Sequence, residues 1–175
     1  MTNWLLRTFI KNSDHPEDPK VRAAVGILSG IVGIFCNILL FGGKLAVGLL
    51  TRSVSITADA MNNLSDATSS VVTMLGFRLA ERPADEEHPF GHARYEYLSG
   101  LAVSALILII GVELAKSSLD KVLHPAAVEF GWTTAAVLAG SILVKLWMSL
   151  FNTKLGKTIH SATLAATAAD SRNDV

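Results

Sequence analysis

Oxygen-bearing side chains recur at helical spacing within one stretch of the sequence. They are Asp59, Asn62, Asn63 and Asp66. Offsets of three, four and seven residues place them along one face of a helix. Because an aspartate at the centre of a membrane helix costs roughly 2.5 to 3.5 kcal/mol on insertion scales, such a face needs a partner or a function. Carboxylate and amide oxygens suit divalent cations, so this face predicts a metal site.

A second pair of carboxylates lies near the end of the sequence. Asp170 and Asp174 are four residues apart and would share a helix face one turn from each other. Counted from Lys157 at about 1.5 Å per residue, Asp170 is expected about 20 Å into its helix, at membrane depth. Asp66 is likewise expected near the bilayer midplane. Two helices would therefore bring oxygen ligands to a similar depth.

The combined set favours a hard or intermediate divalent ion. Three carboxylates at one depth repel strongly unless a cation or protons neutralise them. All-oxygen ligation suits Mn²⁺, Mg²⁺ or Fe²⁺ better than Zn²⁺, which is usually held by histidine nitrogen or cysteine sulfur. A packing role remains open for Asn63 and Asp59, because polar side chains also hydrogen-bond neighbouring membrane helices. Alternatively, Asp59 lines an exit path.

A further group of ligand type lies between two expected helices. Asp85, His88 and His92 offer one carboxylate and two imidazoles, which is a reasonable ligand set for a divalent metal. Another interpretation is that these side chains pair with Arg82 and Arg94 or terminate helices.

Long apolar segments must position these residues. Half of the 175 residues are hydrophobic, and residues 24–43 contain no charge over about the 20 residues that a bilayer core of about 30 Å requires. We predict an all-α, polytopic transmembrane helical bundle with spans at 24–50, 55–80, 97–122, 130–151 and 158–175. The last span is short, so a fragment of a longer chain is expected.

Composition and charge exclude other classes. The formal net charge is zero and the basic residues form no run, which argues against nucleic-acid binding. The single cysteine, Cys36, excludes a disulfide framework within the chain and is expected to act as a small buried hydrophobe. Residues 1–23 do not resemble a signal peptide, and the distribution of Lys and Arg predicts a cytoplasmic N-terminal segment.

Three motifs resemble the cation diffusion facilitator family. Residues 53–66 (SVSITADAMNNLSD) are similar to its second transmembrane helix, residues 85–92 (DEEHPFGH) to the loop that follows, and residues 169–174 (ADSRND) to its fifth helix. The resemblance covers essentially the whole chain, and the motifs agree in order and spacing.

The resemblance implies a specific transport site. In this family a ligand pair on the second helix faces a pair on the fifth, which here implies Asn62 with Asp66 and Asp170 with Asp174, and selects Asn62 over Asn63. Zinc-transporting members typically have histidine in these pairs. The absence of histidine here is similar to the bacterial manganese-exporting branch.

Further expectations follow from the same resemblance. It implies a cytosolic metal site at Asp85, His88 and His92, a sixth helix and a C-terminal cytoplasmic domain outside this chain, and a homodimer in the bacterial inner membrane. The expected activity is Mn²⁺ efflux by alternating access in exchange for protons, with Fe²⁺, Co²⁺ and Zn²⁺ as alternatives. Metal binding and proton binding are antagonistic because ligand carboxylates must be deprotonated.

Rival functions fit the sequence less well. A metal-dependent membrane lipid phosphotransferase would carry a denser cluster of aspartates with Gly and Arg on one helix, so we expect a secondary transporter and no enzyme. A membrane scaffold would use its polar residues only to join helices. Lys44 and Lys145 are assigned no transport role and are expected to snorkel or to pair with a carboxylate such as Glu113. His160 is expected to be solvated.

Overall fold

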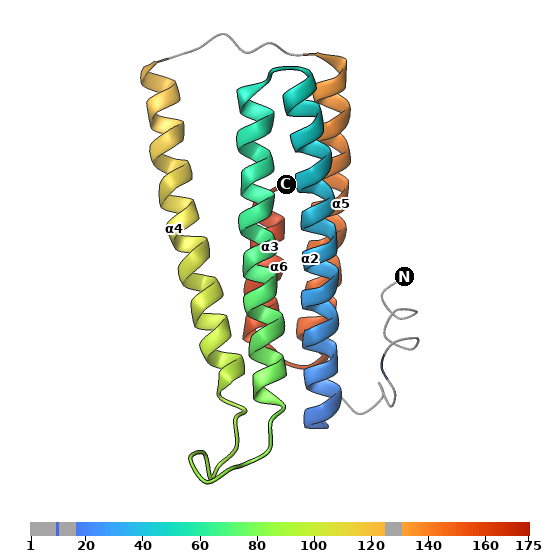
Figure 1. Cartoon of the computed structure of the whole chain (residues 1–175), viewed down its shortest axis with the longest axis vertical. Coiled ribbons are helices and arrows are strands. Elements are labelled where there is room, and N and C mark those ends of the chain that lie inside the picture. Colours follow the sequence, from blue (N-terminus) through green and yellow to red (C-terminus); the bar gives the residue numbers. More distant parts are fainter. Residues whose placement is uncertain (1–9, 11–16, 125–130) are drawn as a thin grey trace.

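Every secondary-structure element in the described part of the chain is an α-helix. The computed structural model describes residue 10, residues 17–124 and residues 131–175. Five helices follow one another along the chain and lie roughly along one axis (Figure 1). Their bounds are α2 Pro19–Leu50, α3 Val54–Ala80, α4 Tyr95–Leu123, α5 Trp132–Thr158 and α6 Ala162–Asn173. The predicted fold class is confirmed.

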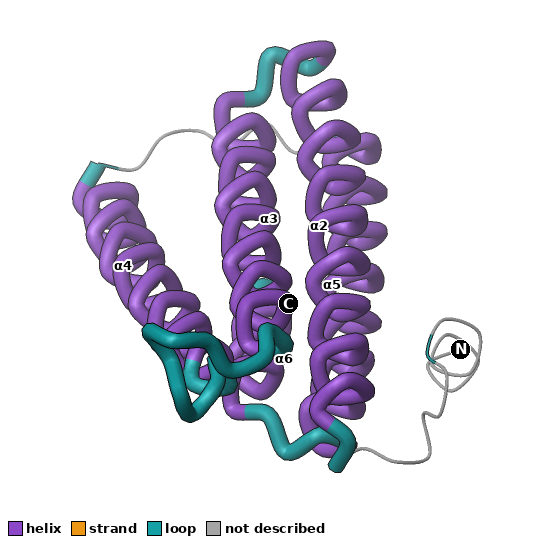
Figure 2. Tube along the Cα trace, turned by 60° about the horizontal axis from the view of Figure 1, so that its bottom comes forward, coloured by secondary structure: helices purple, strands orange, loops and turns teal. Residues whose placement is uncertain are grey.

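The helices pack as neighbouring pairs, with the short final helix α6 against three of them. Helix α2 packs against α3 and α5, while α6 contacts α3, α4 and α5. Figure 2 shows α4 leaning away from the other helices toward its C-terminal end. Residues 111–120 of α4 are all exposed. The closest packing is between α2 and α3, and α6 is held mainly against α5 and α4.

Three of the described helices are long and apolar enough to cross a membrane. They are Pro19–Leu50, Tyr95–Asp120 and Trp132–Thr158. Helix α3 has 27 residues but carries the predicted polar face, and α6 has only 12 residues. The polar content of α3 is consistent with a helix that faces protein on one side.

Capping residues explain where the predicted helix bounds were wrong. Asp18 caps α2 by accepting a hydrogen bond from the Lys20 N–H, so this helix begins at Pro19 and not at residue 24. Most of the predicted N-terminal segment, residues 1–9 and 11–16, lies outside the described residues.

The boundary between the fourth and fifth predicted spans also differs. Helix α5 continues to Thr158, and exposed His160 adopts a φ of 49° in the turn that follows. Ser161 then caps α6. Asp170 is therefore only about 12 Å into its helix at about 1.5 Å per residue, and the predicted 20 Å was wrong.

Close helix contact in the α2–α3 pair depends on small residues. Gly26 faces the ring of Phe77, and Gly33 faces Ser70, where an added Cβ would lie 2.5 Å from the hydroxyl oxygen. Small residues allow membrane helices to approach closely. This contact fixes the register of the antiparallel pair.

A buried ion pair joins three helices at the end where α2 and α4 begin. The Arg22 guanidinium donates to both carboxylate oxygens of Glu96 at 2.7 Å and also to the Ile159 carbonyl. Ser161 donates to Glu96 Oε1 at 2.8 Å. Glu96 is only 5% exposed, so its charge is satisfied almost entirely by protein. The pair connects α2, α4 and the turn before α6.

Replacing Glu96 by Ala is expected to lower the free energy of unfolding by about 3 to 5 kcal/mol. The substitution leaves the half-buried Arg22 guanidinium without its carboxylate, which is the usual penalty for breaking a buried pair. Denaturant unfolding in detergent micelles measures the change. Glu113→Ala is the matched control, because Glu113 lies on the same helix and is exposed. Equal stability of the two variants would contradict this role.

Candidate metal centre

The centre of the helix bundle contains a lysine shared by two carboxylates. Lys145 Nζ lies 2.6 Å from Asp66 Oδ2 and 2.7 Å from Asp174 Oδ2. Lys145 is 2% exposed and Asp66 is 4% exposed. Helices α3, α5 and the end of α6 therefore meet at one ammonium group. The prediction that Lys145 would pair with a carboxylate such as Glu113 was right in the kind of partner and wrong in its identity, because Glu113 is exposed on α4.

The third predicted carboxylate belongs to the same electrostatic cluster. Half-buried Asp170 interacts electrostatically with Asp66, Asp174 and Lys145. The Asp174 backbone N–H donates to the Asp170 carbonyl at 3.2 Å, so the last turn of α6 holds these residues one turn apart. We call Asp66, Asp170, Asp174 and Lys145 the central cluster.

The central cluster lies near mid-height in the bundle. Lys145 is the middle residue of α5, which spans Trp132–Thr158, and Asp66 lies near the middle of α3. Figure 1 shows the C-terminal end of the chain within the length of α2 and α3, away from both ends of these helices. Charged groups at this depth lie where hydration by bulk water is poorest.

The two asparagines of α3 differ in environment. Asn62 is half-buried one turn from Asp66 and makes no hydrogen bond to another described side chain. Asn63 is 1% exposed, and its Nδ2 donates to the Asp59 carbonyl at 3.0 Å. No hydrogen-bond partner among the described residues reaches Asn63 Oδ1. Asn63 therefore has a local structural contact that Asn62 lacks.

Asp59 forms an ion pair away from the central cluster. Lys44 Nζ lies 2.8 Å from Asp59 Oδ2, and Lys44 is buried although it lies in the most apolar helix. The prediction that Lys44 would pair with a carboxylate such as Glu113 was wrong in the identity of the partner. Asp59 thus connects α3 to α2 two turns before Asp66.

Sequence reasoning missed a buried amide on α2. Asn37 is 2% exposed, and its Oδ1 has no hydrogen-bond partner in the described part of the chain. Gly33 faces Ser70 and Lys44 pairs with Asp59, so the antiparallel register places Asn37 level with Asp66. The available signal was that Asn37 is the only amide residue within the apolar stretch 24–43.

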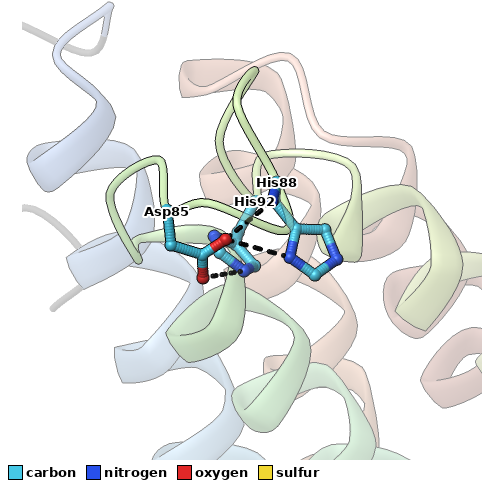
Figure 3. Close-up of side chains that lie close together, drawn as sticks. All are labelled: Asp85, His88 and His92. Atoms are coloured by element: carbon cyan, nitrogen blue, oxygen red, sulfur yellow. Dashed lines mark hydrogen bonds and ion pairs between the residues drawn. The ribbon is translucent and has the colours of Figure 1, made fainter.

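The loop between α3 and α4 brings its three predicted ligands together. Figure 3 shows both imidazoles beside the Asp85 carboxylate. His88 Nδ1 lies 3.2 Å from Asp85 Oδ1 and His92 Nε2 lies 3.5 Å from Asp85 Oδ2. One potential ligand atom from each residue lies within 4.8 Å of the others. We call this group the loop cluster.

Hydrogen bonds fix the geometry of the loop cluster. The His88 backbone N–H donates to Asp85 Oδ1 at 2.7 Å and lowers the pKa of this carboxyl from its ordinary value, with the nearby imidazoles contributing. His92 Nδ1 lies 3.0 Å from the Pro83 carbonyl, which orients its ring. Asp85 makes no ion pair with an arginine among the described residues, so the alternative pairing was wrong.

Replacing His92 by Ala is expected to weaken divalent metal binding by the loop cluster about tenfold or more. The substitution removes one of three ligands and its oriented ring, and losses of even outer-sphere partners cost roughly 10- to 100-fold in affinity. Titration of the purified protein with Mn²⁺ or Zn²⁺ measures the change. His124→Ala is the matched control, because His124 forms a similar 3.2 Å pair with Asp120 but has no third ligand there among the described residues. Equal effects of both substitutions would contradict metal binding by the loop.

Comparison with known proteins identifies one matching family and several similar proteins. Residues 30–175 match the family described as the cation efflux transmembrane domain. The manganese efflux system protein MneS of Bacillus subtilis is 31% identical over 149 residues, which cover 85% of this chain and 51% of that protein. MneP of the same organism is 27% identical over 146 residues, with 83% and 48% covered.

A protein from another bacterial genus is also similar to this chain. A probable cation efflux system protein of Mycobacterium tuberculosis is 28% identical over 163 residues, which cover 93% of this chain and 49% of that protein. The chain therefore spans about half the length of the curated relatives it matches.

Proposed function

Because the chain belongs to the cation efflux family, also called cation diffusion facilitators, we propose that it forms the membrane part of a secondary transporter that exports Mn²⁺. The chain belongs to an integral membrane protein, and three of its described helices are long enough to span a bilayer. The family consists of transporters and not of enzymes. Family membership supports transport of a metal cation, and manganese as the exported metal is the more specific part of the proposal.

The convergence of Asp66 and Asp174 at mid-bundle is the observation that carries this proposal. Both carboxylates are held within 2.7 Å of the same ammonium, and Asp170 interacts electrostatically with both. A transported ion would bind to these three carboxylates and to the half-buried Asn62. We call Asn62, Asp66, Asp170 and Asp174 the transport site.

The oxygen-only ligand set supports manganese as the substrate. None of the four ligands is a histidine or cysteine, the residues that usually hold Zn²⁺. The names of two Bacillus relatives, which are manganese efflux proteins, point in the same direction. Fe²⁺, Co²⁺ and Zn²⁺ are the competing substrates.

The proposed cycle is alternating access. Mn²⁺ enters from the cytoplasm, exchanges its water for the transport-site oxygens and leaves on the opposite side. Protons are the proposed counter-ions, because they compete with metal for the same carboxylates. The loop cluster, Asp85, His88 and His92, is proposed to bind metal on the cytosolic side, at the bundle end where α4 begins. Family resemblance supports a homodimer in the bacterial inner membrane, and the distribution of Lys and Arg supports an N-terminus in the cytoplasm.

Metal content of living cells tests the proposal. Cells expressing the full-length protein that contains this chain would be challenged separately with manganese, iron, cobalt and zinc, and intracellular metal measured by elemental analysis. We expect intracellular manganese to fall selectively relative to vector-only cells. Equal lowering of zinc would overturn the manganese assignment, and no change for any of the four metals would overturn efflux itself.

A further inference from the structure

Lys145 occupies the oxygens that a metal ion in the proposed transport site would need. Its ammonium lies 2.6 Å from Asp66 Oδ2 and 2.7 Å from Asp174 Oδ2. These two residues lie 79 and 29 positions away along the chain, so tertiary structure and not local sequence creates the contact. A divalent ion that uses these two Oδ2 atoms must displace the ammonium, and even an ion that binds the Oδ1 atoms would lie beside its positive charge.

We propose that Lys145 is an internal competitor for the transported metal: its ammonium binds Asp66 and Asp174 and is displaced from them when the ion binds. This inference rests on the proposed function, and it concerns how that same site is regulated. Lys145 thereby limits the affinity of the transport site and favours release of the ion. It acts through the ligands and does not itself bind metal.

The chemistry of lysine fits this role. Its ammonium is a compact point charge on a flexible four-carbon stem, so it can leave one pair of oxygens by rotating about side-chain bonds. Ordinary snorkelling toward a membrane surface does not apply here, because Lys145 is the middle residue of its helix and is 2% exposed. Partners for this charge must come from the protein.

Charge balance supports a lysine that moves off the two oxygens but stays in the site when the ion binds. With all three carboxylates ionised, they and the one ammonium would sum to a charge of minus two, which a single divalent cation would neutralise. A site at this depth is sensitive to such a balance, because uncompensated charge is strongly disfavoured there. The lysine therefore matches the site to one divalent ion while it competes for two of its ligands.

A purely structural role for Lys145 and a competitor role predict opposite effects of its loss on metal binding. If Lys145 only held α3, α5 and α6 together, its loss would loosen the site and weaken metal binding. If Lys145 competes with metal, its loss frees two carboxylates and strengthens binding. The sign of the affinity change separates the two roles.

Titration of the full-length protein with Mn²⁺ tests this sign. Lys145→Met, which removes the ammonium and keeps an unbranched side chain only one atom shorter, would be compared with wild type, both in a His92→Ala background that weakens binding at the loop cluster. We expect Mn²⁺ to bind at least about tenfold more tightly to Lys145→Met, because a nearby positive charge has been removed. Lys154→Met is the matched control, because Lys154 is exposed on the same helix, and should bind as wild type does.

Transport kinetics and melting provide independent measurements. In proteoliposomes, Lys145→Met should lower both KM and kcat for Mn²⁺, because tighter binding slows release. If the variant is unstable, the rise in Tm caused by a fixed Mn²⁺ concentration should exceed the rise in wild type.

The outcomes separate this inference from the function on which it rests. Unchanged or weaker Mn²⁺ binding by Lys145→Met, or an equal or smaller rise in Tm, would overturn the competitor role while the transport site stands. Absence of Mn²⁺, Fe²⁺, Co²⁺ and Zn²⁺ binding by both wild type and variant would overturn the proposed function, and this inference with it.

Discussion

Asp66→Asn is expected to reduce Mn²⁺ transport by about 100-fold or more. The substitution preserves size but removes one of three carboxylates from the transport site and leaves Lys145 beside a neutral amide. Losing a direct ligand should exceed the roughly 10- to 100-fold effects typical of outer-shell partners. Uptake of Mn²⁺ by proteoliposomes containing the full-length protein measures the change.

A surface aspartate provides the control for Asp66. Asp120 is exposed on α4 and, among the described residues, pairs with exposed His124, so Asp120→Asn should transport at the wild-type rate. Comparable amounts of folded Asp66→Asn protein must be reconstituted, as judged by gel filtration in detergent. Wild-type transport by folded Asp66→Asn would rule out Asp66 as an essential ligand.

Asn62→His is expected to shift the preference of the transporter from manganese toward zinc by about tenfold or more. An imidazole nitrogen in place of an amide oxygen gives the site the ligand type that Zn²⁺ usually selects. Asn62 is half-buried and makes no hydrogen bond to another described side chain, so the exchange should not break an existing contact. Competition of Zn²⁺ against Mn²⁺ transport measures the ratio.

The amide of Asn62 can be retained in a companion variant. Asn62→Gln keeps the carbonyl oxygen and should keep the preference for manganese, although its longer side chain is expected to weaken binding. An unchanged metal preference in Asn62→His would show that this position does not contact the ion. Asn63 would then become the better candidate, because its buried Oδ1 lacks a partner among the described residues.

Apolar length and helical spacing made much of the fold predictable. The uncharged run at residues 24–43 and the polar face of residues 59–66 each fall within a helix of the expected type. The error at the start of α6 has a local cause. His160 takes a positive φ and Ser161 caps the next helix, and neither feature alters the hydrophobic pattern that set the prediction.

The candidate sites were predictable to different degrees. Residues 85–92 contain all three members of the loop cluster, so spacing alone suggested their proximity, and the structure brings them together. The contacts of Lys145 with Asp66 and Asp174 were missed, because periodicity identifies the faces of single helices and cannot show which faces meet. The contact with Asp66 spans 79 positions and depends on the packing of α5 and α6. Metal binding at either site stays a prediction.

The most direct test is to locate manganese in crystals of the full-length protein by anomalous scattering at the manganese absorption edge. We expect a peak between α3 and α6, in contact with carboxylate oxygens of Asp66, Asp170 and Asp174, with Lys145 Nζ moved away from its present position. A peak at the loop cluster alone, with Lys145 still bound to Asp66 and Asp174 in manganese-soaked crystals, would contradict the assignment of the transport site.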